Sequence, residues 1–142
     1  MQRKTAEIPI AVALQDQRWL IIARRNNPAF RPPTDVIELG DRLLVRVEIA
    51  GMRSSDFNIT LHDRVLLVTG TREQPPQTSP AYHQAEIGYG EFRVEVTLPW
   101  SVERERVSAS YEAGFLQVEL PRMAGKQIPV RDVTEMETDS GQ

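Results

Sequence analysis

The sequence has 142 residues, a length that suits one domain with a real core and residues left over for tails. It contains no cysteine, which excludes a disulfide framework and a thiolate nucleophile. The net charge of -3 hides a basic first segment, since residues 1–33 carry six Lys/Arg and two Asp/Glu. These cations are scattered, whereas a nucleic-acid footprint needs a denser basic face, so we do not expect nucleic-acid binding.

Neither a signal peptide nor a membrane span is visible in the sequence. The longest apolar run near the start, Trp19 to Ala23, is far too short to cross a bilayer. We therefore expect a cytoplasmic protein with no membrane partner.

Residues 1–33 form an N-terminal arm without a sustained hydrophobic period, and Arg31-Pro32-Pro33 marks its end. Residues 12–25 can form a short amphipathic helix. The arm is too short to bury its own apolar side chains, so we expect these to contact other protein chains; the alternative is a disordered tail. The residues concerned are Ile8, Ile10, Leu14, Trp19, Leu20, Ile21, Ile22 and Phe30.

After Pro33 the apolar residues recur every second position, which predicts half-buried strands. The run Val65 to Val68 is apolar on both faces and is therefore expected at the centre of a sheet, with Gly70 closing the strand. The expected strands comprise residues 36–39, 43–49, 57–61, 65–68, 92–98, 107–111 and 116–120. Short strands in this number, with no convincing helix between them, predict an all-β sandwich over residues 34–122.

The last two of these strands form a hairpin from Val107 to Pro121, around which the domain is organised. A turn this short needs positive φ, which Gly114 adopts at little steric cost because it has no Cβ.

A long connection runs from Thr71 to Gly88, and segments of this size are usually functional or disordered. Its second half has the composition of a strand that pairs outside its own sheet. The residues of this strand are Tyr82, His83, Gln84, Ala85, Glu86 and Ile87.

The sequence carries no pattern typical of catalysis, a cofactor or a metal. The two histidines, His62 and His83, have neither a cysteine nor a second histidine at ligand spacing. Glu103 and Glu105 could form an acid–base pair, but they alternate with arginines, which favours a solvated turn. We therefore expect no enzyme activity.

Three short sequence motifs of this chain resemble those of the small heat shock proteins, whose defining unit is the α-crystallin domain. The hairpin segment from Ala109 to Leu116 is similar to the family's Ala-x-x-x-Asn-Gly-Val-Leu signature. Tyr89-Gly90-Glu91-Phe92 and Leu98-Pro99 match its Tyr-Gly-x-Phe and Leu-Pro. Beyond Pro121 the chain is polar apart from Ile128-Pro129-Val130, which matches the family's C-terminal Ile-x-Ile/Val.

The resemblance implies an Ig-like β-sandwich between a flexible arm, residues 1–33, and a C-terminal extension, residues 123–142. It implies a dimer in which residues 82–87 cross to the partner's strand near residues 35–39, and higher homo-oligomers in which Ile128, Pro129 and Val130 dock in a neighbour's groove. By similarity, the groove residues are Ile59, Leu61, Val107 and Ala109.

The implied function is that of an ATP-independent holdase that binds partly unfolded client proteins through its arm and groove and prevents their aggregation. An alternative is a monomeric β-sandwich adaptor resembling the p23-like co-chaperones. A weaker third possibility is a nucleic-acid binder that uses the basic arm.

One further hypothesis concerns Ile8-Pro9-Ile10, which repeats the spacing of Ile128-Pro129-Val130. Under this hypothesis the arm competes with the C-terminal tripeptide for the same groove. The alternative is an incidental pair of isoleucines beside a proline.

Overall fold

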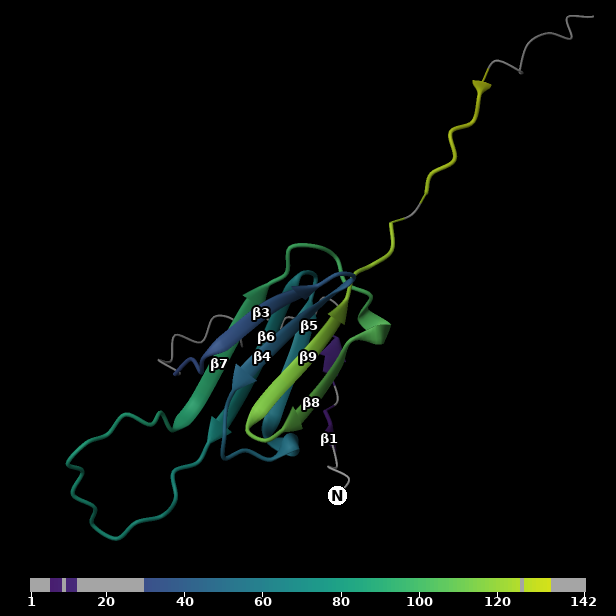
Figure 1. Ribbon diagram of the computed structural model, residues 1–142. Helices are drawn as coiled ribbons and strands as arrows, with labels where there is room; N and C mark the ends of the chain where they lie inside the picture. Colours follow the sequence, from purple (N-terminus) through teal and green to yellow (C-terminus); the bar gives the residue numbers. More distant parts are fainter. Residues whose placement is uncertain (1–5, 9, 13–29, 126, 134–142) are drawn as a thin grey trace, which may run out of the picture.

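Two β-sheets pack face to face in the computed structural model, which describes residues 6–8, 10–12, 30–125 and 127–133 (Figure 1). One sheet has the strand order β1-β8-β9-β4-β3 and the other has the order β2-β5-β6-β7. The strands are β1 (Ala6–Glu7), β2 (Ile10–Val12), β3 (Thr34–Leu39), β4 (Arg42–Glu48), β5 (Phe57–His62), β6 (Val65–Arg72), β7 (Gly90–Thr97), β8 (Ser108–Glu112) and β9 (Phe115–Pro121). Two short 3₁₀ turns, η1 (Ser54–Asp56) and η2 (Arg104–Arg106), precede β5 and β8.

The inward-facing residues of the two sheets form one hydrophobic core, so the predicted all-β sandwich is confirmed. Strand β5 shows the alternation best, with Phe57, Ile59 and Leu61 buried and the residues between them more exposed. Strand β6 pairs with β5 on one side and β7 on the other, the central place that its apolar run predicts. The face-to-face packing buries these side chains away from water, which is the main favourable term in the stability of such a domain.

The expectation that Gly70 closes its strand is wrong, because β6 continues to Arg72. A Cβ built on Gly70 would lie 2.6 Å from the Phe92 ring and 2.7 Å from the carbonyl oxygen of Asp56. The glycine is therefore required by the close approach of an aromatic ring and a backbone segment rather than by a turn.

The β8–β9 hairpin turns through Ala113 and Gly114, which have φ values of 52° and 85°. Two central residues with positive φ are the mark of a type I′ turn, whose twist matches that of the flanking strands. The prediction for Gly114 is confirmed. The structure adds that Ala113 takes the same left-handed conformation, which is unfavourable for a residue with a Cβ.

Three residues of the arm pack on their own sandwich, which corrects the expectation that the arm cannot bury its apolar side chains within the same chain. Ile8 is part of the core, and Ile10 and Phe30 pack against it. The physical reason is that β8 and β5 would otherwise be edge strands of their sheets. The short strand β1 adds to the edge of β8, and β2 adds to the edge of β5. Leu14, Trp19, Leu20, Ile21 and Ile22, with most of the expected helix, lie outside the described residues.

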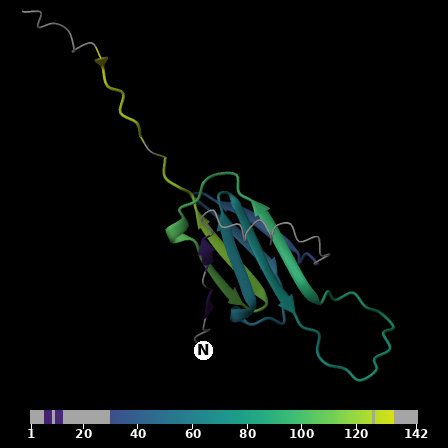
Figure 2. The same ribbon diagram turned by 180° about the vertical axis from the view of Figure 1, so that it is seen from behind.

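The long loop and the C-terminal extension leave the sandwich at opposite ends (Figures 1 and 2). The loop, residues 73–89, contains no strand, and no strand includes a residue of the described part of the extension, residues 123–125 and 127–133. The two segments therefore extend into solvent where another chain can reach them.

Candidate functional site

The four residues predicted to line the groove lie on or next to β5 of one sheet and β8 of the other. Ile59 and Leu61 on β5 and Ala109 on β8 are buried, and Val107, just before β8, is partly buried against the core. The structure thus brings the four predicted residues to one side of the sandwich.

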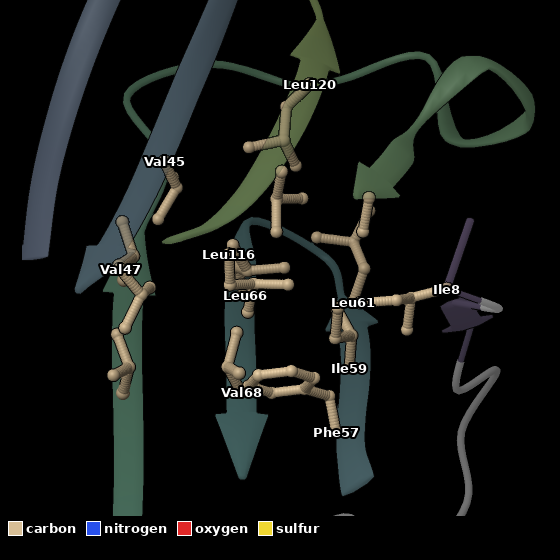
Figure 3. Close-up of a cluster of buried hydrophobic side chains, with 14 of the residues drawn as sticks. Ile8, Val45, Val47, Phe57, Ile59, Leu61, Leu66, Val68, Leu116 and Leu120 are labelled. Carbon is tan, nitrogen blue, oxygen red and sulfur yellow. The ribbon is translucent and has the colours of Figure 1, made fainter. Parts of the chain in front are cut away.

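Residues 6–8 and 10–12 of the arm lie at the place predicted for this groove. The backbone nitrogen of Ile8 donates a hydrogen bond to the carbonyl oxygen of Ala109 at 3.0 Å. Two residues on, Ile10 pairs with Ile59 in the parallel ladder of β2 and β5. Figure 3 shows the Ile8 side chain pointing toward Leu61 and Ile59. The arm therefore covers the surface that the sequence predicts for a tail.

The tail residues of the predicted link are exposed. Ile128 is 82% exposed and Val130 is 98% exposed, and neither residue belongs to a described strand or β-bridge. Aliphatic side chains this exposed gain from burial elsewhere, and both can face one groove because side chains of an extended chain repeat every two residues.

The predicted exchange strand, residues 82–87, is exposed along its whole length and has no strand conformation within the chain. Tyr82 and Ile87 are its large apolar residues, and the Tyr82 hydroxyl accepts a hydrogen bond from the side chain of Gln74. The edge strand β3 has a single neighbour among the described strands, β4, and exposes Val36 and Leu39. One chain thus offers both an unpaired segment and an unpaired edge.

Arg72, at the end of β6, holds the base of this loop and was missed by the sequence reasoning. Its Nε and one terminal nitrogen donate to the carbonyl oxygen of Gly88 at 2.9 and 2.5 Å, and the other terminal nitrogen donates to Ala50 at 3.3 Å. The guanidinium also lies 5.0 Å from the ring centre of Phe30 and 5.6 Å from that of Tyr89. An arginine at the end of a strand gives no signal of such contacts in the sequence.

Phe30 connects the arm to the same region. Its backbone nitrogen donates to the carbonyl oxygen of Glu91, and its own carbonyl accepts from Arg93, both at 3.2 Å. Its ring lies 5.8 Å from that of Phe92, and a Cβ on Gly88 would lie 2.9 Å from it. The end of the arm and the end of the loop are therefore packed together.

The structure places Glu103, one of the two carboxylates considered for acid–base chemistry, next to an arginine. Glu103 forms an ion pair with Arg106 at 3.3 Å on the η2 turn, in line with a solvated turn. Within residues 6–8, 10–12, 30–125 and 127–133, no group of three or more His, Cys, Asp or Glu side chains is placed to hold a metal ion. In the same residues there is no helix of the length and hydrophobicity that a membrane span needs.

Comparison with curated proteins gives heat shock relatives. Small heat shock protein C4 of Rickettsia felis is 29% identical over 98 residues, which are 68% of this chain and 60% of that protein. The 18.1 kDa class I heat shock protein of Pisum sativum is 27% identical over 112 residues, covering 77% of this chain and 71% of the relative. The aligned region spans only 60% of the length of small heat shock protein C4, and also 60% of the length of a second Rickettsia felis relative, small heat shock protein C2.

Solved structures with the same fold carry similar names. Heat shock protein 16.0 from Schizosaccharomyces pombe superposes with a TM-score of 0.60 at 26% identity, covering 72% of this chain and 99% of that chain. A small heat-shock protein from Xylella fastidiosa, described as having a distinct high order structure, superposes with a TM-score of 0.64 at 21% identity, covering 73% and 96%. At 21% identity, the likeness to the Xylella fastidiosa protein shows a shared fold.

The Hsp20/alpha crystallin family model matches residues 35–134, which include strands β4 to β9, all of β3 except Thr34, the long loop and the Ile-Pro-Val tripeptide of the extension. Since this match covers more than half of the 142 residues, the chain belongs to the Hsp20/alpha crystallin family.

Proposed function

We propose that this chain is an ATP-independent holdase that forms homo-oligomers and binds partly unfolded proteins, so that they do not aggregate. One observation supports the proposal: the chain has an exposed Ile128 and Val130 on its extension and, on its body, the edges of β5 and β8, where isoleucine side chains of the arm pack against the core. Each subunit thus carries both halves of an intermolecular link, and links of this kind can join many subunits.

The strength of one such link suits reversible assembly. Burying two aliphatic side chains contributes about 3 to 6 kcal/mol before the costs of association are subtracted. A single link is therefore weak, and several links in one assembly become strong by multivalency. An assembly held in this way can exchange subunits and expose apolar surface without a fuel.

The dimer of the proposal forms by exchange of residues 82–87 onto the partner's β3. The exposed Ile87 and Tyr82 would then contact a surface that includes Val36, which is exposed in the single chain. Strand addition satisfies backbone groups on both sides, since an edge strand and an orphan segment each have unpaired N–H and C=O groups.

Client proteins would bind to apolar surface on the arm and in the groove. This role extends to Trp19, Leu20, Ile21 and Ile22, and to Ile8, Ile10 and Phe30 when they leave the sandwich. Binding to the unfolded state of a client lowers the concentration that can aggregate, which requires no catalysis and no nucleotide. A cytoplasmic location is part of the same proposal, because a chain without cysteine is compatible with a reducing compartment.

Native mass spectrometry or light scattering tests the assembly. The intact chain is expected as a large oligomer, and the double variant Ile128→Ala/Val130→Ala is expected to shift toward dimers. Val133→Ala is the matched control, since Val133 is a third exposed aliphatic residue of the same extension but lies outside the tripeptide. A monomeric intact chain would instead support the p23-like adaptor, and a double variant that keeps its large oligomers would contradict the link.

Light scattering of a heat-labile model enzyme, heated with the chain in the absence of ATP, tests the holdase activity. Scattering is expected to fall as the chain approaches equimolar amounts, whereas an equal mass of serum albumin leaves it high. Unchanged scattering would contradict the holdase function whatever the oligomeric state.

A further inference from the structure

The chain contains two copies of one short apolar pattern, and the structure holds them in opposite states. Ile8-Pro9-Ile10 lies in the arm and Ile128-Pro129-Val130 lies in the extension. The first isoleucine of the arm is only 5% exposed, whereas the two aliphatic residues of the extension are 82% and 98% exposed. The same pattern is therefore docked at one end of the chain and free at the other.

The docked copy connects the edges of both sheets. Strand β1 pairs antiparallel with β8, so that Glu7 lies opposite Ser110, and β2 pairs parallel with β5, so that Ile10 lies opposite Ile59. Ile8, between the two strands, is part of the core between the sheets. The arm thus uses the edge hydrogen bonds of β5 and β8 and fills the apolar space between them.

We propose that Ile8-Pro9-Ile10 is a built-in competitor of the tail: it occupies the groove of its own chain, and the Ile128-Pro129-Val130 of another subunit binds only where it has left. The inference rests on the proposed tail link. A strand edge has one set of backbone groups to offer, and a close-packed groove cannot hold two aliphatic side chains in the space of one. The two segments are therefore alternative occupants of the groove.

The arm competes with an advantage, because it belongs to the same chain as the groove. A tethered segment acts at an effective concentration in the mM range, far above the concentration of free tails in a dilute solution. The observed affinity of a tail is then its intrinsic affinity multiplied by the fraction of grooves from which the arm has left. Assembly through the tail therefore depends on how readily the arm leaves its own groove.

Tail docking also has a consequence for the arm. Each groove that takes a tail releases a segment whose isoleucines were packed in the core. Assembly and exposure of arm surface are thus coupled, and the coupling acts equally in both directions because both are binding equilibria.

A disulfide lock tests the competition. The chain has no cysteine of its own, so Glu7→Cys/Ser110→Cys introduces a single possible pair. Because Ile8 and Ala109 form a hydrogen-bonded position, the neighbouring pair is a non-hydrogen-bonded one, with Cα atoms about 4.5 Å apart and within disulfide range. Oxidation should fix the arm in the groove, and reduction should free it in the same molecule.

The probe is a fluorescein-labelled peptide of residues 123–133, and binding is measured by fluorescence anisotropy. The protein is the full chain with Ile128→Ala/Val130→Ala, so that its own tails do not compete. We expect the oxidised form to bind the peptide at least ~10-fold more weakly than the reduced form. In the same background without added cysteines, Ile8→Ala/Ile10→Ala should bind it several-fold more tightly than the unaltered arm, because the competitor is weakened.

Thr71→Cys/Glu91→Cys is the matched control. It places a disulfide between the paired, exposed positions of β6 and β7, away from β5 and β8, and its oxidation should leave peptide binding unchanged. Circular dichroism melts of every form check that each one is folded. Electrophoresis without reductant checks that the Glu7→Cys/Ser110→Cys disulfide is within one chain.

Equal peptide affinity of the oxidised and reduced forms would overturn the competition. A disulfide that links two chains instead of closing one would also overturn it, because the arm would then dock on a neighbour. No peptide binding in any form, including Ile8→Ala/Ile10→Ala, would overturn the tail link together with the competition. The client-scattering assay is independent of all three results and reports on the holdase function alone.

Discussion

Arg72→Met should destabilise the domain, because this side chain joins three parts of the chain. The methionine keeps an unbranched apolar stem but removes the three hydrogen bonds to Gly88 and Ala50 and both contacts with the aromatic rings. A hydrogen bond to a charged group contributes about 1.5 to 3 kcal/mol. Arg72 is only half-buried, so water can replace part of what is lost. We therefore expect the free energy of unfolding to fall by about 2 to 3 kcal/mol in total.

Urea unfolding monitored by tryptophan fluorescence measures this change at a fixed chain concentration. The stability of Arg72→Lys should lie between those of the unaltered chain and Arg72→Met, with a loss of about 1 kcal/mol. An ammonium group keeps the charge but lacks the planar fork with which the guanidinium reaches two carbonyl oxygens. Arg64→Met is the matched control, since exposed Arg64 makes one long hydrogen bond of 3.5 Å to Pro99. A loss below about 0.5 kcal/mol for Arg72→Met, no larger than for the control, would refute the assigned role.

Three further stability predictions use the same assay. Gly70→Ala should cost about 3 kcal/mol, because the added methyl group meets a ring and a backbone oxygen that cannot both move away, whereas Gly125→Ala, with no atom within 4 Å of the new Cβ, should stay within about 0.5 kcal/mol. Ala113→Asn should raise stability by about 1 kcal/mol, because asparagine tolerates the left-handed conformation better; an unchanged midpoint would contradict this reading of the turn. Tyr111→Phe should cost about 1 to 2 kcal/mol, because the hydroxyl donates to the carbonyl oxygen of Ile49 at 2.7 Å; a fully stable variant would mean that water replaces it.

The strand exchange gives a fifth prediction. Ile87→Asp puts a charge on the exposed segment that would lie on a partner's sheet. The double variant Ile128→Ala/Val130→Ala is expected to form dimers, and the triple variant that also carries Ile87→Asp is expected to be monomeric. Native mass spectrometry measures the change, and Glu86→Asp is a conservative control in the same segment. Dimers that persist with Ile87→Asp would show that the chains pair elsewhere.

The strands of the body were predictable because their signal is local. In β5, buried and exposed residues alternate along the chain, and the apolar run of β6 indicates its central place without reference to any partner. The turn at Gly114 was predictable for the same reason, since a tight hairpin needs positive φ whatever surrounds it.

The contacts that involve distant residues were not predictable in this way. The reason for Gly70 lies in Phe92 and Asp56, and Arg72 reaches Gly88, Ala50 and the arm. The spacing of these residues in the sequence does not predict their contacts, because each contact depends on which strands become neighbours in the two sheets.

The sequence by itself determined the class of fold, the hairpin, the long loop and the presence of two similar Ile-Pro-Ile/Val segments. Only the tertiary structure decided which of the two lies in the groove. Ile8 and Ile128 have the same local pattern and the same side chain, and they differ in what surrounds them. Burial of an apolar side chain depends on the edges and core residues that the rest of the chain brings within reach, and residue 109 reaches residue 8 only through the fold.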